Sequence, residues 1–399
     1  MTASAPHPLY WDHCATTPTS PRVIEAMGRS LSEHFANPSS GHMWGARARD
    51  TVEEARVHLA ELLGASAREL IWTSGATEAN NISIFGAASR AAQPIHMISQ
   101  VTEHSAVLEP IAELERRGHQ VTRLSVNAQG MIDLAELDAA LKPETRLVTL
   151  MHANNEVGSL LPLVEVGELI RARAHPECIF HVDAAQSVGK IPINLAKLEV
   201  DLLSLSAHKF YGPKGVGALY IRRATGRTLD RRSSSRSPLR LPPLCLGGAQ
   251  ERGVRPGTLA THQIVGLGVA AREAIDDLAD GGEPRLRALT QQLYRGLKRL
   301  DPQARRRSPE SGAPHILSIT LDPALLERIE DHWSHIAFSR GSACHSTAHA
   351  PSHVLLALGL SSEEASRTLR FGLGRSTTSQ EVSEALQRLG DLSLPDHLM

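Results

Sequence analysis

Short apolar runs alternate with amphipathic stretches through the middle of the chain. The runs are rich in Val, Ile and Leu, and they predict strands over residues 70–73, 95–100, 121–125, 146–152, 178–183, 201–206 and 216–222. Apolar residues at helical spacing between them predict helices over 78–88, 106–117, 134–141 and 164–174. Strands that alternate with helices are typical of a mainly parallel sheet covered on both faces. We therefore expect an α/β fold with a seven-stranded sheet.

The pattern changes after residue 222. Residues 222–240 hold seven arginines and no apolar periodicity, which predicts a loop or an insertion. Beyond a glycine-rich turn, the pattern predicts helices over 259–278, 284–300, 324–331 and 379–389, and strands over 316–321, 336–339 and 368–373. We expect a large domain over 16–257 and a smaller α+β domain made of 1–15 and 258–399.

The composition narrows the class of protein. The 399 residues carry 42 Lys and Arg against 43 Asp and Glu, so the formal net charge is −1, and 41% are hydrophobic. These values exclude a disordered chain and give no overall attraction to nucleic acid or membranes. No apolar run approaches the roughly 18 residues that span a bilayer, and residues 1–8 have neither the basic nor the apolar region expected of a signal peptide. The four cysteines form no C-x-x-C pair, so we expect a reduced, cytoplasmic protein.

Two motifs place ionisable side chains at the ends of predicted strands. Lys209 follows the strand at 201–206 and precedes a Gly/Pro loop, where its amine can form a Schiff base with a carbonyl. Asp183 ends the strand at 178–183, where a buried carboxylate needs a partner, such as the protonated ring nitrogen of pyridoxal phosphate. A solvated loop lysine and an aspartate that caps a turn are the alternatives.

Two further motifs follow strands in the first half of the chain. Small residues at 73–78 join a strand to a helix, and the N–H groups at such a helix N-terminus bind phosphate. Every α/β protein contains several such turns, so this signal is weak. Glu103 and His104 follow the strand at 95–100, where a surface or core histidine is the alternative.

The last third of the chain offers a cysteine and an arginine. Cys344 lies among glycine, serine and histidine rather than in an apolar run, so its thiol can be exposed and reactive. Arg370 lies in the strand predicted at 368–373, where a fixed guanidinium can bind a carboxylate.

Histidine spacing in this region also suggests a metal site. His345, His349 and His353 are four residues apart, a spacing that zinc sites use on helices. Pro351 interrupts the stretch, and 20 histidines make such coincidences common. We therefore expect no metal.

Taken together and in this order, the motifs resemble those of the pyridoxal phosphate-dependent cysteine desulfurases of the class V aminotransferase family. The matching stretches cover nearly the whole chain and include YWDHCATTP at 10–18, TSGATEAN at 73–80, TEHSAV at 102–107, MHANNEVG at 151–158, HVDAAQSVGK at 181–190, SAHKFYGPKGVG at 206–217, GVRPGTLATHQ at 253–263, GSAC at 341–344 and RFGLGR at 370–375. The resemblance implies fold type I of these transferases, pyridoxal 5'-phosphate as the cofactor and conversion of L-cysteine to L-alanine.

The resemblance also implies a role for each matching residue. Lys209 would hold the cofactor as a Schiff base, Asp183 would pair with the ring nitrogen, and Gln186 with the ring hydroxyl. His104 would stack on the ring and assist proton transfer. The residues implied for the phosphate are Ala76, Thr77, Ser206, His208 and, from the partner subunit of a homodimer, Thr258. Those implied for the substrate carboxylate are Asn155 and Arg370, with Asn37 close by. Cys344 would take the sulfur as a persulfide and pass it to an acceptor protein.

Some features depart from the usual family pattern. The short stretch at 339–360 resembles the group I form, but residues 222–240 are longer and more basic than the usual connection. A solvated loop is one interpretation, and a docking patch for an acidic sulfur acceptor or a nucleic-acid-bound complex is the other. The chain also stops soon after the helix predicted at 379–389, without the longer tail by which other members hold the iron–sulfur scaffold protein. We expect a dedicated acceptor, with DNA phosphorothioation as one candidate pathway and no direct contact with nucleic acid.

Two other classes of function remain open from the sequence. A selenocysteine lyase or another class V enzyme is the first, although an aminotransferase would need no thiol at Cys344. A non-enzymatic adaptor is the second, and the joint presence of Lys209, Asp183, His104 and Cys344 argues against it.

Overall fold

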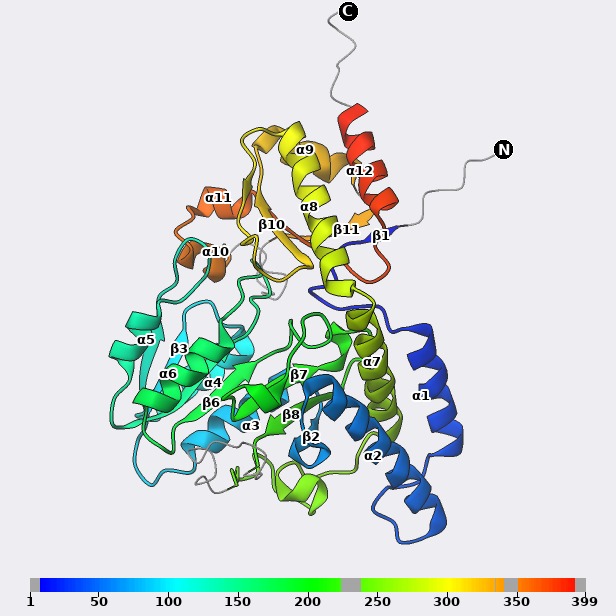
Figure 1. Ribbon diagram of the computed structural model, residues 1–399, viewed down its shortest axis with the longest axis vertical. Helices are drawn as coiled ribbons and strands as arrows, with labels where there is room; N and C mark the ends of the chain where they lie inside the picture. Colours follow the sequence, from blue (N-terminus) through cyan, green and yellow to red (C-terminus); the bar gives the residue numbers. More distant parts are fainter. Residues whose placement is uncertain (1–7, 224–237, 334, 341–350, 392–399) are drawn as a thin grey trace, which may run out of the picture.

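A seven-stranded sheet lies at the centre of the larger part of the molecule. The computed structural model describes residues 8–223, 238–333, 335–340 and 351–391 (Figure 1). The strand order is β2-β8-β7-β6-β5-β3-β4. The strands are β2 (Leu70–Thr73), β3 (His96–Gln100), β4 (Gln120–Leu124), β5 (Thr145–Met151), β6 (Ile179–Asp183), β7 (Leu202–Ser206) and β8 (Gly217–Ile221). Only β8 runs antiparallel to its neighbours in this sheet, so the predicted mainly parallel α/β fold is confirmed.

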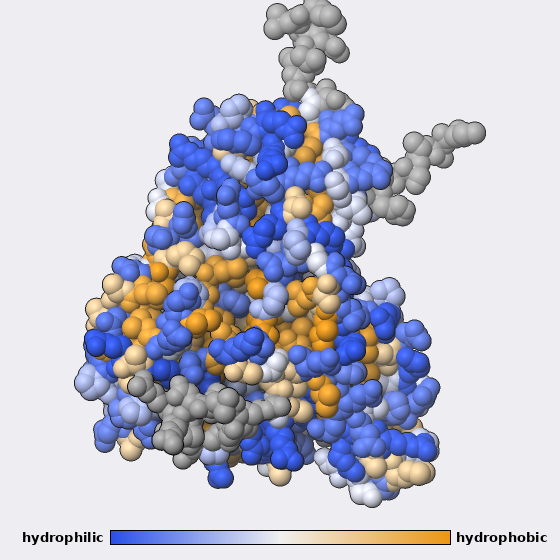
Figure 2. All heavy atoms as spheres, in the orientation of Figure 1, coloured by the Kyte–Doolittle hydropathy of each residue, from blue (hydrophilic) through white to orange (hydrophobic). Residues whose placement is uncertain are grey.

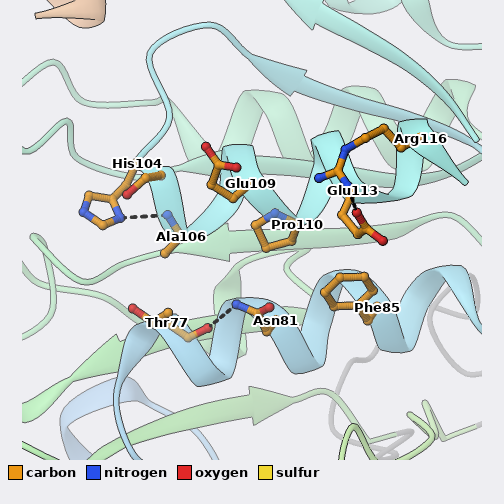
Figure 3. A pocket seen from close by; sticks show the side chains of 10 residues that line it. Thr77, Asn81, Phe85, His104, Ala106, Glu109, Pro110, Glu113 and Arg116 are labelled. Carbon is orange, nitrogen blue, oxygen red and sulfur yellow. Dashed lines mark hydrogen bonds and ion pairs between the residues drawn. The ribbon is translucent and has the colours of Figure 1, made fainter. Parts of the chain in front are cut away.

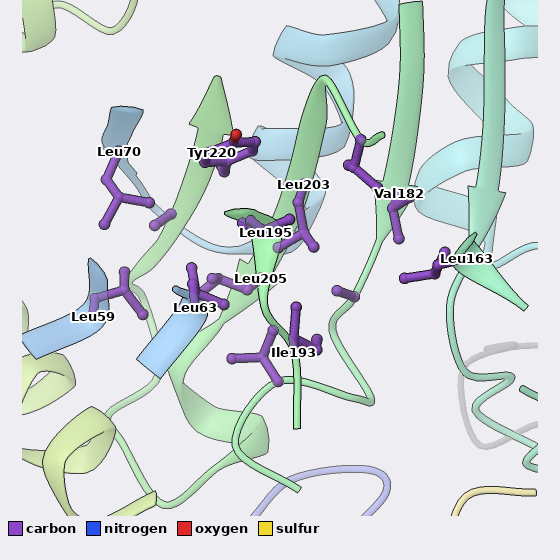
Figure 4. Packing of buried hydrophobic residues seen from close by; sticks show 14 of the residues in the cluster. Leu59, Leu63, Leu70, Leu163, Val182, Ile193, Leu195, Leu203, Leu205 and Tyr220 are labelled. Carbon is purple, nitrogen blue, oxygen red and sulfur yellow. The ribbon is translucent and has the colours of Figure 1, made fainter. Parts of the chain in front are cut away.

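Helices cover both faces of this sheet, which explains why its strands read as continuous apolar runs. They are α1 (Pro21–Glu33), α2 (Met43–Leu63), α3 (Ala76–Ala88), α4 (Ser105–Arg116), α5 (Leu134–Ala140), α6 (Leu163–Arg173) and α7 (Thr261–Ala279). On one face, Leu59 and Leu63 of α2 pack into the same core as Leu203 and Leu205 of β7 (Figure 4). On the other face, α3 and α4 pack over the sheet through residues such as Ile82.

A smaller sheet with its own core forms the upper part of Figure 1. Its order is β12-β13-β10-β9, and all its neighbours pair antiparallel. Its elements are α8 (Gly282–Leu300), β9 (Arg305–Arg306), β10 (Ile316–Thr320), α9 (Pro323–His332), β12 (Ser339–Arg340), α10 (His353–Ala357), α11 (Ser362–Ser366), β13 (Thr368–Gly372) and α12 (Ser379–Asp391). The N-terminal strand β1 (Leu9–Tyr10) joins this part by pairing with β11 (Ile336–Ala337). Trp11, Trp333 and Phe371 pack edge to face in its core.

The strand predicted at 336–339 is two strands in the structure. β11 pairs with β1, whereas β12 pairs with β13 in the antiparallel sheet. The apolar pattern marks the extended backbone but not its partners, because those partners lie far away in sequence. Helices α1 and α2 were not predicted either, although Ser20 caps α1 and accepts a hydrogen bond from the Val23 N–H.

Helix α7 joins the two parts of the molecule. It packs against α1 and α2 through Ile264 and Leu267, and it runs upward toward α8 (Figure 1). Hydrophilic side chains cover the surface over α8 and α12, while hydrophobic ones gather across the middle of the same face (Figure 2). No helix in the described part of the chain is long and apolar enough to cross a membrane.

Candidate active site

The ends of the central parallel strands bring the predicted lysine and aspartate to one edge of the sheet. Asp183 is the last residue of β6, and Ser206 is the last residue of β7. Lys209 ends the short helix η3 (Ala207–Lys209) that follows β7 directly. Ligands of open α/β sheets bind outside the carboxyl ends of parallel strands. We call these three residues the strand-end wall of the site.

The Lys209 amine is held by the N-terminal segment. Its Nζ donates hydrogen bonds to the carbonyl oxygens of Cys14 at 2.7 Å and Ala15 at 2.9 Å. The Cys14 carbonyl also accepts a hydrogen bond from Gln186 Nε2 at 2.9 Å. Lys209 and Gln186 therefore converge on one backbone carbonyl, although 172 residues or more separate each of them from Cys14.

The Asp183 carboxylate has only neutral hydrogen-bond donors among the described residues. Asn80 Nδ2 donates to Oδ2 at 2.7 Å, and the Ala185 N–H donates to Oδ1 at 2.9 Å. Asp183 is 6% exposed and Asn80 is fully buried. Because these donors carry no charge, the carboxylate keeps its negative charge available for a cation.

The turn between β2 and α3 has the form expected of a phosphate site. Gly75 has φ +151°, a conformation that side chains disfavour, and no side chain caps the N-terminus of α3. Ala76 and Thr77 are the first residues of this helix, where the N–H groups and the helix dipole favour anions. A Cβ at Gly75 would lie 3.5 Å from Ser206 Oγ, so the turn adjoins the end of β7.

His208 lies in η3 next to Lys209 and is a neutral ring. Burial, with the charges of Lys209 and Lys214, lowers the pKa of His208 to about 4. Its Nδ1 lies 3.0 Å from the Thr16 hydroxyl. The imidazole is therefore uncharged at neutral pH, and its other nitrogen can take part in hydrogen bonds with a ligand.

His104 stands at the start of α4, beside a pocket of about 480 Å³ between α3 and α4 (Figure 3). Its Nδ1 accepts a hydrogen bond from the Ala106 N–H at 3.0 Å, so the side chain caps the helix. A neutral ring that accepts at Nδ1 carries its proton on Nε2. The pocket also contacts Thr77, so it links the two predicted cofactor residues.

The opposite side of the site comes from the N-terminus and the smaller sheet. Arg370 of β13 is 3% exposed, and its Nη2 donates to Asp12 Oδ1 at 2.9 Å and to the Ser339 hydroxyl at 3.0 Å. Its Nη1 donates to the carbonyl oxygen of Asn155 at 2.9 Å. The Nε atom has no hydrogen-bond partner among the described residues. We call Asp12, Ser339 and Arg370 the small-sheet wall.

Each wall has a buried glutamate within range of its charged residue, Glu103 with Asp183 and Glu156 with Arg370. Burial and then the charge of Asp183 raise the pKa of Glu103 well above its usual value. Burial likewise raises the pKa of Glu156 to about 7, although a hydrogen bond from Ser352 and the charge of Arg370 oppose the shift. A protonated carboxyl carries no charge, so neither group in that form competes with Asp183 for a cation.

Contacts within the described part of the chain do not connect three of the predicted site residues to the other site residues. Asn37 is exposed in the connection between α1 and α2, where its Oδ1 accepts from the Ser39 N–H. Thr258 is exposed as well. Cys344 lies outside the described residues, as do His345 and His349. His353, by contrast, is hydrogen-bonded to the Glu103 carbonyl oxygen at 3.1 Å. No group of three possible metal-ligating side chains occurs in the described ranges.

Several residues of the site carried no role in the sequence analysis. Asn80 supports Asp183, Asp12 pairs with Arg370, and Glu156 bonds to Ser352. Asn80, Asp12 and Glu156 all lie inside the stretches that match the family. Their position in those stretches was the available signal, but their partners depend on contacts between distant segments.

Comparison with known proteins identifies the class. The model of the family described as "Aminotransferase class-V" matches residues 9–385, and the chain belongs to this family. The chain is 44% identical over 386 residues to the cysteine desulfurase IscS of Proteus mirabilis, covering 96% of this chain and 92% of that protein.

Solved structures agree with this class. A NifS-like protein aligns with a TM-score of 0.85 and 34% identity, covering 96% of this chain and 99% of that one. DndA from Streptomyces lividans aligns with a TM-score of 0.75 and 38% identity, over 90% and 97% of the two chains. The predicted family and the fold type are therefore confirmed.

The residues present fit pyridoxal 5'-phosphate, the cofactor that the family implies. The buried Gln186 Oε1 has no hydrogen-bond partner among the described residues and can accept from a ring hydroxyl. Lys209 supplies an amine for a Schiff base, Asp183 supplies a carboxylate for the ring nitrogen, and the uncapped turn at Gly75 supplies donors for a phosphate.

Proposed function

We propose that this protein is a cysteine desulfurase that converts L-cysteine to L-alanine and leaves the sulfur as a persulfide on Cys344. The observation that carries the proposal is the position of Asp183 at the end of β6 and of Lys209 just after the neighbouring strand β7, in a chain 44% identical to a cysteine desulfurase. The thiol of Cys344 bonds to the substrate sulfur, and the Cβ–S bond of the substrate breaks. The thiol proton is balanced by the proton that alanine gains.

Each described residue has a task in this proposal. Bound pyridoxal phosphate supplies an electron sink that stabilises negative charge at the substrate Cα. Asp183 keeps a positive charge on the ring nitrogen, because its own hydrogen-bond donors are neutral. Lys209 moves the proton at the substrate Cα, and His104 holds a proton on Nε2 while its Nδ1 is fixed by α4. Arg370 offers the substrate carboxylate its unpaired Nε–H.

The remaining site assignments belong to the same proposal. Ala76, Thr77, Ser206 and His208 hold the phosphate, and Gln186 binds the ring hydroxyl. Asn155 and Asn37 act with Arg370 on the substrate. Asn37 is placed there by the resemblance alone.

An assay of products tests the activity. The purified chain is incubated with L-cysteine and a reductant, and alanine and sulfide are measured. We expect equal amounts of both, and we expect Cys344→Ser to abolish both while the cofactor absorbance persists. A Cys344→Ala variant controls for the serine hydroxyl. Turnover at the parent rate in either variant would exclude Cys344 as the nucleophile.

We also propose an obligate homodimer in which Thr258 reaches the phosphate of the partner subunit. The exposure of Thr258 supports this, since its side chain is not used by its own subunit's core. Mixing Lys209→Ala chains with Thr258→Ala chains tests the idea, because each mixed dimer regains one complete site. We expect cofactor affinity at that site to match the parent's.

The acceptor and its pathway are the least constrained part of the proposal. We propose a dedicated acceptor protein, with DNA phosphorothioation as the candidate pathway, on the basis of the family resemblance and the seven arginines at 222–240. Charge reversal of Arg231, Arg232 and Arg236 should weaken acceptor binding at low salt. Residues 224–237 lie outside the described ranges, so this part depends on the sequence alone.

We propose further that the chain divides into a large domain over 16–257 and a small one made of 1–15 and 258–399, and that the protein works in the cytoplasm. The pairing of β1 with β11 supports the N-terminal assignment. Within the described part of the chain no disulfide joins Cys14, Cys178 and Cys245, which suits a reducing compartment.

A further inference from the structure

The free edge of the central sheet is closed by side chains instead of another strand. β2 is the edge strand beside β8. The Trp72 N–H on its open side donates to Glu251 Oε2 at 2.7 Å. The Leu70 carbonyl oxygen accepts from Arg56 Nη1 at 3.0 Å and from Arg252 Nη2 at 2.8 Å. Backbone groups that another strand would pair are thus satisfied by one short segment and by α2.

That short segment is held in an unfavourable backbone conformation. It is the helix η4 (Gln250–Gly253), in which Glu251 has φ +45° and Arg252 has φ +58°. Residues other than glycine rarely adopt this left-handed region, and such strain collects at functional sites. The surrounding contacts must therefore favour this conformation strongly.

A buried ion pair supplies those contacts. Arg56 donates from both Nη atoms to the two carboxylate oxygens of Glu251, each at 2.9 Å. Arg56 is 5% exposed and Glu251 is 8% exposed, so water screens the pair little. The Arg56 guanidinium also lies 5.0 Å from the centre of the Trp72 ring.

A second ion pair, made just beyond η4, ties the same stretch of chain to the helix that follows the turn between β2 and α3, which we call the phosphate turn. Arg255 Nε donates to Glu78 Oε1 at 2.9 Å, and Glu78 in turn accepts from the Ser74 N–H. Glu78 lies in the first turn of α3. Glu251 therefore holds the strand that enters the phosphate turn, and Arg255 holds the helix that leaves it. Thr258 follows three residues after Arg255.

We propose that Glu251 is a positioning residue. It fixes the phosphate turn of its own subunit relative to the segment around Thr258, and that segment reaches the site of a second copy of the chain. This inference rests on the proposed function, since it assigns the phosphate of the cofactor to that turn. Glu251 touches no reacting atom. It acts through the N–H of Trp72 and through the backbone that leads to Thr258.

The test separates a phosphate-specific role from a general role in folding. Cofactor-free parent and Glu251→Gln chains are titrated with pyridoxal 5'-phosphate and with pyridoxal, which lacks the phosphate, and binding is followed by absorbance. We expect Glu251→Gln to weaken binding of the phosphate form roughly 10-fold and to leave pyridoxal binding within about 2-fold of the parent. Equal weakening of both ligands, or no weakening of either, would overturn the inference.

Two further variants keep the test decisive if Glu251→Gln folds poorly. Arg255→Gln breaks the outer ion pair, which is about one-quarter exposed, and leaves no buried charge unpaired. We expect the same selective loss at a smaller size, and a folded Arg255→Gln that binds both ligands like the parent would count against the inference. Glu61→Gln is the matched control. Glu61 lies on α2, the helix that carries Arg56, and the substitution breaks its exposed ion pair with Arg272 of α7. It should change neither affinity.

The outcomes also distinguish this inference from the proposed function. If the parent itself binds no pyridoxal 5'-phosphate, the proposed function and the positioning role of Glu251 are both wrong. If the parent binds the cofactor and forms alanine while both variants keep full selectivity for the phosphate, only the positioning role fails.

Discussion

The two walls of the site are built in different ways. The strand-end wall holds Asp183, Ser206 and Lys209, and each ends or closely follows an apolar strand that the sequence pattern predicts. The small-sheet wall holds Asp12, Ser339 and Arg370, which come together from residues up to 358 positions apart. Parallel strands deliver their ends to one edge whatever the connections between them, so the first wall follows from local patterns. The second depends on pairing between remote segments.

The walls also differ in their electrostatics. Asp183 receives hydrogen bonds only from neutral groups among the described residues, whereas Arg370 is paired with the carboxylate of Asp12. No cation pairs with Asp183 among the described residues, so its carboxylate can accept one from a ligand. Arg370 keeps part of its charge engaged and offers mainly the direction of its Nε–H. We expect substitutions in the first wall to affect turnover and those in the second to affect substrate binding.

The largest effect should come from Asp183→Asn. The amide keeps the shape of the side chain but cannot hold a positive charge on the ring nitrogen. We expect the turnover number to fall by at least about 100-fold, comparable to the loss of one preorganised electrostatic group in other enzymes. The KM for L-cysteine should change little. A large rise in KM with unchanged turnover would erase the distinction between the walls.

The buried carboxyl group of Glu156, which feels the charge of Arg370, should make stability depend on pH. Its pKa is raised from 4.5 to about 7, so the fold favours the protonated form. Its contribution to the free energy of unfolding is complete below about pH 4.5 and is lost as the pH rises through about 7. The upper bound for that loss is roughly 3 kcal/mol.

Glu156→Gln mimics the protonated form at every pH and provides the measurement. The free energy of unfolding of this variant, relative to the parent, should increase between pH 5 and pH 8 in denaturant titrations. Glu136→Gln, which removes a partly exposed carboxylate that bonds to Ser125, is the comparison variant for the loss of a carboxylate elsewhere. A constant difference between Glu156→Gln and the parent would show that this carboxyl does not titrate in that range.

Arg370→Lys should affect the second wall more moderately. Lysine keeps the charge but lacks the planar fork that contacts Asp12, Ser339 and Asn155 together. We expect the KM for L-cysteine to rise roughly 30-fold, as befits the loss of one charged hydrogen bond, with a smaller change in turnover. Steady-state kinetics measure both. A loss confined to turnover would move Arg370 to the first wall.

The smallest effect should come from Gly374→Ala, just beyond β13. A Cβ at this position would overlap the ring of the buried His13, so the two segments must move apart. We expect a loss of about 1–3 kcal/mol in the free energy of unfolding. The double variant His13→Ala with Gly374→Ala should recover part of it. Equal losses in the single and double variants would mean that the ring contact is not the cause.

Much of the fold could be predicted from local patterns, and parts of the site could not. The strand predicted at 70–73 matches β2 residue for residue, and each of the other six strands of the large sheet differs from its prediction by one residue at one end or at both ends. The strand predicted at 336–339 divides between two sheets because pairing partners leave no trace in apolar periodicity. Asn80, Asp12 and Glu251 escaped notice for the same reason, since each acts through a partner more than 100 residues away.

By itself, the sequence determined the seven strands of the large sheet and the helices between most of them, the family, and the placement of Lys209 and Asp183 at strand ends. Those features depend on side-chain periodicity and on motifs contained in a few consecutive residues. Only the tertiary structure decided that the Cys14 carbonyl holds both Lys209 and Gln186, that Asp12 pairs with Arg370, and that Glu251 closes the edge of β2. These contacts arise when separate segments pack together and bury polar groups that must then find partners.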